Sequence, residues 1–427
     1  MPKLSPDQGP PLSIPMSFFL SAPVSLSAAG LLLLVRADDG IATSFAQSNV
    51  ALVHLGALGF LLFVIAGAMY QLLPVAAGAL VPFVRLAHLV HALLVAGTGA
   101  LVLAQWQLLP RLFAYGSGLL GAAFLLWLAP SAHALAKSRM SHPTAWGLRL
   151  AIASILAAAT LGLRMAMARA GIDLPGDFLT IRMTHAALGP IVFVGGLIAS
   201  VSWQVIPMFF LAAQPPRWLP KVVMAGVLAS LIGLVIMAFF AVPSWAVTIA
   251  AAPAAIAVWL IQPAWTARAL RARKRKRPDA TLLGWWISIA LSPLCLVAGA
   301  IAGLSDRPTP PIVWGVLVLW GQAGLLVHAM LTRIVPFLVY LHKSAPLVAT
   351  HRVRSAKELL PDREVRIGVA IHAASLILGL FAAFSASNVW WQTFGVSLLV
   401  TAAFLTFELI AAWQRGRTPI SRRAAPS

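Results

Sequence analysis

The sequence predicts an all-α polytopic membrane protein of about twelve transmembrane helices, in three four-helix arcs with pseudo-threefold symmetry. Three observations predict this fold: too few charges for a soluble surface, twelve apolar stretches of spanning length, and a motif that returns every fourth stretch. Of the 427 residues, 60% are hydrophobic and 10% are charged, whereas soluble proteins carry about 25% charged residues. Charges this sparse would not cover a water-soluble body of this size.

Twelve apolar stretches are separated by charged or turn-forming residues. A helix needs about 20 apolar residues to cross the hydrocarbon core of a membrane, and the stretches are about that long. They lie at about 14–35, 47–73, 82–105, 111–131, 147–168, 183–212, 220–242, 244–266, 281–303, 311–341, 366–385 and 388–413. No small-residue cleavage site follows the first stretch, so we expect it to be a retained helix.

Most of the 31 Lys and Arg residues lie on one side of this map. If the N-terminus is inside, the inner loops collect Arg268–Arg277, Lys343–Arg366 and the basic tail from Arg415 onward. The positive-inside rule then predicts a bacterial-type inner (plasma) membrane protein with both termini cytoplasmic. The run Arg271–Arg277 lies between two spans, which favours contact with anionic head groups of the lipid bilayer. We therefore expect the bilayer as a partner, and no nucleic acid.

The second, sixth and tenth stretches end in a shared pattern: a bulky or β-branched residue, a long polar residue, two aliphatic residues and a proline. Its three copies are Tyr70-Gln71-Leu72-Leu73-Pro74, Trp203-Gln204-Val205-Ile206-Pro207 and Thr332-Arg333-Ile334-Val335-Pro336. The prolines are 133 and 129 residues apart, which is four stretches each time. This spacing predicts one transmembrane domain over 1–427, with internal repeats at about 14–131, 147–266 and 281–413. The three motif helices would be equivalent and inward-facing; the alternative is that proline simply ends each helix.

This arrangement resembles the catalytic subunit of the heme-copper oxidases and nitric oxide reductases, which has twelve helices in three four-helix arcs. The closest local match is His54 followed by the segment Gly67–Pro74, which is similar to the second helix of nitric oxide reductases. In that family the histidine of this helix ligates the low-spin heme. The resemblance covers the helix count of the whole chain, but only the second span at motif level. It implies a protein that binds heme b or copper.

The sequence departs from the family at the copper site. The family needs a histidine in the sixth helix and a pair in the seventh; His185 is present, but the seventh stretch, Lys221 to Phe240, has no histidine. The tenth stretch carries only His328 where the family has two histidines for its hemes. One imidazole does not build a copper centre that needs several. We therefore expect a reduced relative, comparable with the NnrS group of heme- and copper-containing membrane proteins, that does not reduce oxygen or nitric oxide.

Histidines inside a membrane are costly and are candidate functional residues. The spans contain His54, His88, His91, His185, His328 and His372. His54 and His185 lie toward the outer face on equivalent helices, whereas His328 lies about 15 Å deeper than His54. Because two imidazole nitrogens on one metal lie about 4 Å apart, this depth argues against pairing His54 with His328.

His54 and His185 are therefore the predicted metal ligands, and His91 and His328 are further cofactor-binding candidates. Thr184, beside His185, is the expected group that orients the ligand ring. Arg182, near the outer end of the sixth span, is expected to bind heme propionates; the alternative is an interfacial arginine that reaches toward water. For each histidine the alternative is a hydrogen bond between packed helices.

Three functions fit these observations. The first is a heme- or copper-binding protein without a full oxidase centre, which transfers electrons with a partner protein or binds nitric oxide or another diatomic gas. The second is a cofactor-free transporter or permease, although transporters usually show two-fold repeats and Glu408 is the only carboxylate deep in a span. The third is an assembly partner of a respiratory complex, with structural histidines.

Overall fold

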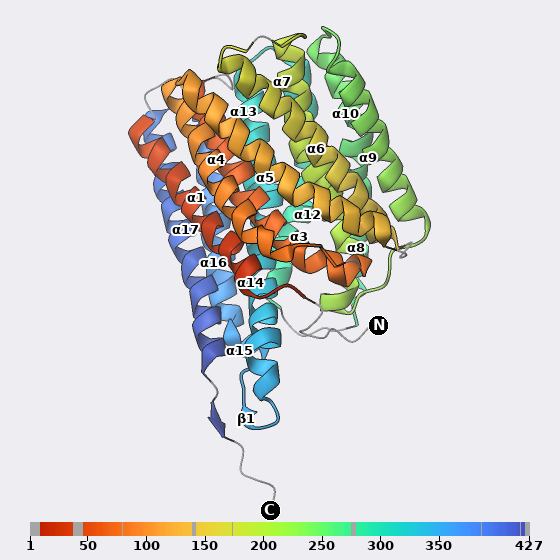
Figure 1. The fold of residues 1–427 in the computed structure, drawn as a ribbon, viewed down its shortest axis with the longest axis vertical. Helices are drawn as coiled ribbons and strands as arrows, with labels where there is room; N and C mark the ends of the chain where they lie inside the picture. The colour runs from red at the N-terminus through yellow and green to blue at the C-terminus, as the bar shows by residue number, and fades with distance from the viewer. Residues whose placement is uncertain are drawn as a thin grey trace, which may run out of the picture.

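The computed structural model describes residues 9–36, 46–78, 80–138, 142–172, 174–274, 279–385, 387–418 and 420–422. Twelve helices of these segments are long and apolar enough to cross a membrane, as the sequence predicts. They lie side by side in an elongated bundle (Figure 1). The β structure of the described segments is one short ladder, β1 (His351–Arg352) with β2 (Ser421–Arg422). The chain is an all-α multi-pass membrane protein.

Eight spans are built on a single α-helix. These are α1 (Ser13–Arg36), α4 (Ala87–Gln107), α5 (Pro110–Lys137), α6 (Pro143–Arg169), α9 (Trp218–Met237), α12 (Thr281–Leu304), α16 (Asp362–Ser385) and α17 (Asn388–Arg417).

Four spans contain a π-helical segment. They are α2 (Gln47–His54), η2 (Leu55–Leu62) and α3 (Phe63–Ala77); α7 (Phe178–Ala187), η4 (Leu188–Gly195) and α8 (Gly196–Phe210); α10 (Ser244–Ile256), η5 (Ala257–Ile261) and α11 (Gln262–Arg271); α13 (Thr309–Gly315), η6 (Val316–Gly324) and α14 (Leu325–Val339). The last of these continues through η7 (Tyr340–Ser344) and η8 (Ala345–Leu347), and a short helix, α15 (Ala356–Leu359), precedes α16.

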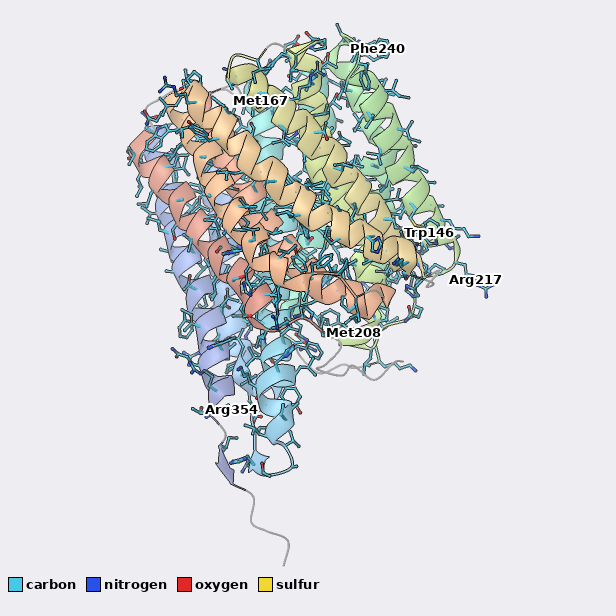
Figure 2. The ribbon with its side chains drawn as sticks, in the orientation of Figure 1. Trp146, Met167, Met208, Arg217, Phe240 and Arg354 are labelled. Carbon is cyan, nitrogen blue, oxygen red and sulfur yellow. The ribbon has the colours of Figure 1, made fainter. Side chains whose placement is uncertain are left out.

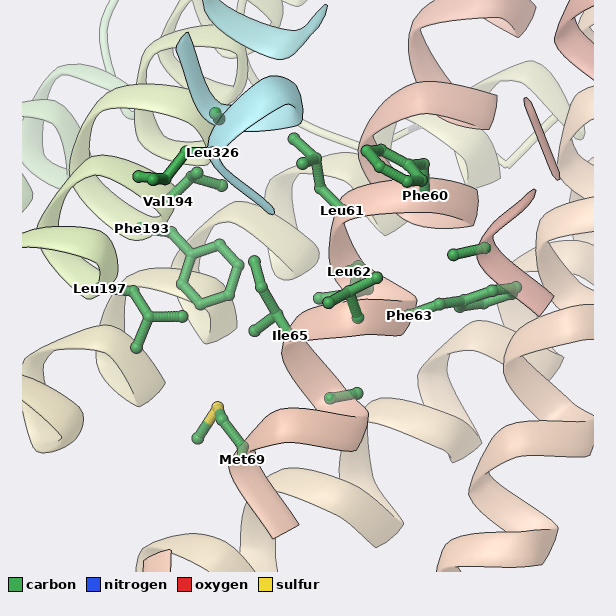
Figure 3. Close-up of a cluster of buried hydrophobic side chains, with 14 of the residues drawn as sticks. Phe60, Leu61, Leu62, Phe63, Ile65, Met69, Phe193, Val194, Leu197 and Leu326 are labelled. Atoms are coloured by element: carbon green, nitrogen blue, oxygen red, sulfur yellow. The ribbon is translucent and has the colours of Figure 1, made fainter. Parts of the chain in front are cut away.

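Nine of the spans pack side by side in a closed ring. Between the repeats, α5 packs on α6 and α10 on α12, and the ring closes where α17 packs on α1. The second, sixth and tenth spans lie inside this ring. Of the most apolar segment of each, 61%, 78% and 61% is buried, whereas in the other nine spans the buried share is at most 56%. Figure 3 shows their side chains meeting in one core, with Phe60, Phe193 and Leu326 from the three spans. The prediction that the motif helices face inward is confirmed.

The three inner spans share a π-helical segment at the same place. These segments, η2, η4 and η6, end at Leu62, Gly195 and Gly324, each twelve residues before the proline of its motif. Single π-helical turns inside α-helices often mark functional sites. Since η6 contacts both η2 and η4, the three segments meet inside the bundle. The common offset supports the repeat, while the rotation that relates its copies stays a prediction.

The alternative, that proline simply ends each motif helix, does not hold. Each helix continues for three residues, to Ala77, Phe210 and Val339. A proline inside a helix has no N–H to offer the carbonyl four residues earlier, and that carbonyl belongs to the first residue of each motif. In a membrane such a helix persists because neighbouring groups compensate locally for the freed carbonyl.

The described chain ends lie at the same end of the bundle. The Gln71 side chain of α3 donates to the carbonyl of Pro10 at 3.4 Å, and Arg354 donates to the carbonyl of Thr418 at 2.8 Å. In Figure 2, Arg354 lies in the lower part of the view, toward the end that carries the chain ends, and Phe240 lies at the top, at the opposite end. We call the end that carries both described chain ends the terminal side, and the other end the distal side.

Candidate functional site

The two predicted metal ligands come together near the distal side. His54 ends α2 and His185 lies in α7, each seven residues after the first residue of its span, Gln47 and Phe178. At 1.5 Å per residue both histidines are about 10 Å deep. Their ring centroids are 6.3 Å apart and their planes differ by 18°.

The equal depth of the two histidines follows from where α7 begins. The sequence predicts a start at 183, which would put His185 at the membrane boundary; the helix instead starts at Phe178. Asp177 caps it, because its Oδ2 accepts hydrogen bonds from the Thr180 backbone and hydroxyl, both at 2.7 Å. Such a cap satisfies a helix N-terminus and carries His185 more than a turn deeper than predicted.

A backbone carbonyl fixes each of these rings. Nδ1 of His54 is 2.7 Å from the carbonyl oxygen of Val50, and Nδ1 of His185 is 2.9 Å from that of Ala158. A carbonyl only accepts, so each Nδ1 carries the hydrogen, and in the neutral ring Nε2 keeps its lone pair. Neither Nε2 has a hydrogen-bond partner in the described part of the chain. The pair thus presents two anchored imidazoles, each with one uncommitted nitrogen.

The group that orients His185 is not the predicted one. Thr184 was the expected partner, but adjacent residues of a helix point in different directions. Its hydroxyl is buried, without a hydrogen-bond partner among the residues described, and Ala158 takes its place. Gly162 gives the His185 ring its room, because a Cβ there would lie 2.9 Å from Cε1 of the ring.

Arg182 lies one turn before His185, where helix geometry puts both side chains on the same face. Arg169 lies near the same end of the bundle, with its guanidinium carbon 5.3 Å from the centroid of the Phe178 ring. Positive charge therefore borders the histidine pair on the distal side.

His328 belongs to a different cluster. It lies nineteen residues into its span, about 18 Å deeper than the His54–His185 pair. Its Nε2 is 2.8 Å from Oε2 of Glu408, and its Nδ1 is 3.0 Å from Nδ1 of His372. Because both nitrogens are engaged within the protein, His328 offers no free nitrogen to a cofactor.

The grouping of His328, His372 and Glu408 is missed by sequence reasoning, which notes Glu408 only as an isolated carboxylate. The three residues lie on α14, α16 and α17, 44 and 80 positions apart. The depth of each residue in the membrane could have indicated this grouping. His372 lies ten residues after the start of α16, and Glu408 lies nine residues before the end of α17. Both helices begin or end at the terminal side, so these positions lie at similar heights.

His91 is also separate from the His54–His185 pair. Its Nε2 is 2.8 Å from the hydroxyl of Ser21 in α1, and its ring packs edge-on against Phe18 at a centroid distance of 5.0 Å. It also contacts Phe63, nine residues further along the span than His54. These contacts fit the alternative of a hydrogen bond between packed helices.

The described segments hold no group of three or more His, Cys, Asp or Glu side chains arranged to bind a metal ion. The His54–His185 pair is a smaller, two-imidazole site. The chain matches no known protein-family model and no curated protein. The case for a function therefore rests on the residues themselves.

Proposed function

We propose that this protein is a metal-binding membrane protein in which His54 and His185 bind one copper ion or one heme iron near the distal side. The observation that carries the proposal is the spacing of two nearly parallel rings, with centroids 6.3 Å apart. A metal–imidazole bond is about 2.0–2.1 Å, and a ring nitrogen lies about 1.2 Å from its centroid. Two imidazoles that bind one metal therefore have centroids no more than about 6.4 Å apart, and the observed spacing lies within this limit.

The hydrogen bonds of the two rings support the same proposal. A histidine that binds a metal commonly donates its other ring N–H to a carbonyl or carboxylate, which fixes the tautomer and the ring orientation. Val50 and Ala158 supply such carbonyls to His54 and His185. Imidazole is a good ligand for copper, zinc and iron, so the donor chemistry fits both metals of the proposal.

Copper fits the packing more directly than heme does. A macrocycle needs a pocket of several hundred Å³. One cavity between the described helices holds about 20 Å³ and is lined by other residues, among them Ser202, Gln262 and Gln322. A single copper ion needs no pocket of that size.

The identity of the metal bears on the role of the protein. A bound copper ion would supply redox chemistry or binding of a small gas. A bound heme would supply electron transfer. In either case His54 and His185 hold and orient the metal, and an electron-transfer partner or a diatomic gas such as nitric oxide would complete the function.

The test is the metal content and visible spectrum of protein purified after expression with ample copper and heme. Wild type should carry one metal per chain, and His54→Ala and His185→Ala should lose it. His88→Ala is the matched control, because His88 is an exposed histidine of a neighbouring span. A Soret band would assign heme; copper without that band would assign copper. A metal-free, colourless wild type would refute the proposal, as would full metal retention in both variants.

Gly162→Ala tests the ring position while both ligands remain. The added methyl would lie 2.9 Å from the His185 ring, so the ring must move. Loss of groups that orient metal ligands typically costs about 10–100-fold in affinity, and we expect a weakening of that size. In Gly118→Ala the added Cβ meets nothing within 4 Å, and this control should bind as wild type does.

A further inference from the structure

Three acid–base side chains meet in the interior of the last repeat. They are His328, His372 and Glu408, and His328 lies between the other two. Its Nε2 is 2.8 Å from Oε2 of Glu408, and its Nδ1 is 3.0 Å from Nδ1 of His372. All three residues are 0% exposed. Ionisable groups inside a membrane are costly, and chains of Asp, Glu and His there commonly relay protons.

The contacts determine how many protons the cluster holds. Nε2 of His372 is 2.9 Å from the carbonyl oxygen of Trp320; since a carbonyl only accepts, this nitrogen carries a hydrogen. In a neutral ring Nδ1 of His372 then accepts the hydrogen on Nδ1 of His328. His328 Nε2 and Glu408 Oε2 therefore share a single proton, either as carboxylic acid and imidazole or as carboxylate and imidazolium.

A transfer along the cluster balances without any other reactant. When the proton moves from Glu408 Oε2 to His328 Nε2, the hydrogen on His328 Nδ1 passes to His372 Nδ1. The products are a carboxylate on Glu408 and an imidazolium on His372. The chain stops at the Trp320 carbonyl, which is not a base in this range, so Glu408 is the end at which a proton enters.

Between Glu408 and the terminal side lie a glycine and an ion pair. The second oxygen of Glu408, Oε1, is buried and has no hydrogen-bond partner among the described residues. Gly368 of α16 faces this oxygen, because a Cβ at that glycine would lie 2.5 Å from it. One helical turn nearer the terminal side, Glu364 forms two 2.8 Å bonds with Arg415. These two side chains are 21% and 32% exposed, so they mark the entrance from water.

Few other charges face the cluster. The packed segments α12, α13 and η6 contain no Asp, Glu, Lys, Arg or His. The remaining charge of α14, Arg333, is paired with Asp279 at 3.1 Å. The segments α15 and η7, which contact α14 and α17, carry Lys357, Glu358, His342 and Lys343. The proton affinity of the cluster is therefore set by its own three members and by charges toward the terminal side, among them the Glu364–Arg415 pair.

We propose that Glu408, His328 and His372 form a proton-binding site that exchanges its proton with the terminal side past Gly368. This site is separate from the His54–His185 pair and does not depend on a metal there.

The chain has only three glutamates, Glu358, Glu364 and Glu408, so the wild-type protein can report on the site directly. Glutamate labelled with ¹³C at Cδ gives three carboxyl resonances by NMR in lipid vesicles, and Glu408→Gln identifies the buried one. We expect this resonance to move between acid and carboxylate positions within about pH 5–8, where histidine titrates. A resonance that stays constant over that range would overturn the proposal.

Two variants test the sharing partner and the entrance. His328→Gln removes the base, and Glu408 should then stay a carboxylic acid throughout, with loss of the pH-dependent shift. Gly368→Ala places a methyl against Oε1, and hydrogen–deuterium exchange at Glu408 should become slower than in wild type. Gly118→Ala, which meets no neighbour, is the control. A shift retained in His328→Gln would refute the sharing, and unchanged exchange in Gly368→Ala would refute the entrance.

Discussion

At the residue scale, the partners of the ring nitrogens separate candidate ligands from packing residues. His54 and His185 give Nδ1 to carbonyls of the helix backbone and keep Nε2 uncommitted. His328 gives both nitrogens to other side chains, and His91 bonds to Ser21. Four histidines that look alike in the sequence thus have different chemistry, because each ring is oriented by what packs beside it.

Asp177 provides a pH-dependent test of the cap that sets the depth of His185. Hydrogen bonds from Thr180 lower the pKa of its carboxyl. A lowered folded-state pKa stabilises the protein above the unfolded value of about 3.9, and this stabilisation is lost as pH falls through the folded pKa. Asp177→Asn should therefore lower the thermal midpoint of the metal-free protein at pH 7.

The same substitution should have little effect at a pH below the folded pKa, where the wild-type carboxyl is itself neutral. Thermal midpoints of the two proteins in detergent, measured across the acid range, supply the comparison. Asp306→Asn, at an exposed loop position of the same side, is the control. Equal midpoints of wild type and Asp177→Asn at pH 7 would show that the cap does not hold α7.

At the element scale, the inner spans combine a π-helical segment with a proline three residues before the end of α3, α8 or α14. The shared motif is visible in the sequence, since proline and its neighbours form a local pattern. The π-helical segments are not, because their sequences differ: Leu55–Leu62 and Leu188–Gly195 are rich in aliphatic residues and glycine, and Val316–Gly324 includes Trp320 and Gln322. Packing inside the ring decides where these segments form.

The closure of the ring depends on two glycines. A Cβ on Gly30 of α1 would lie 2.7 Å from the carbonyl oxygen of Gly395 in α17, and a Cβ on Gly395 would lie 2.8 Å from that of Gly30. Small residues allow such close helix packing in membranes. Because overpacking costs about 1–3 kcal/mol, Gly30→Ala and Gly395→Ala should each lower the free energy of unfolding by about that amount.

Denaturant unfolding in detergent measures this difference, and Gly118→Ala should stay within about 0.5 kcal/mol of wild type as a surface substitution. If Gly30→Ala and Gly395→Ala are as stable as this control, α1 and α17 do not approach at these glycines.

At the scale of the whole molecule, the two polar clusters occupy different heights of one bundle. The His54–His185 pair lies near the distal side, and the Glu408 cluster lies about 18 Å deeper by helix rise. Between them, Phe60 of η2 packs edge-on against Trp320 at 5.9 Å, and Trp320 stacks on His372 at 3.8 Å. The proposed metal site and the proposed proton-binding site are therefore separate in the bundle.

The orientation of the bundle is a prediction of its own. Basic loops on the terminal side favour placing that side in the cytoplasm. Reporter fusions after Lys274 and at the C-terminus should both report cytoplasm, and a fusion after Asp306, between the ninth and tenth spans, should report the opposite side. A non-cytoplasmic signal from either of the first two fusions would reverse the map.

The sequence by itself determined the twelve spans, the common side of the chain ends, the repeated proline motif and the shortage of histidines in the seventh span. These follow from hydropathy, length and local pattern, which act within one helix. Only the tertiary structure decided that His185 is level with His54, that both keep Nε2 uncommitted, and that His328, His372 and Glu408 meet. Contacts of this kind depend on how helices far apart in the chain are rotated and shifted against each other, and hydropathy carries no information on that.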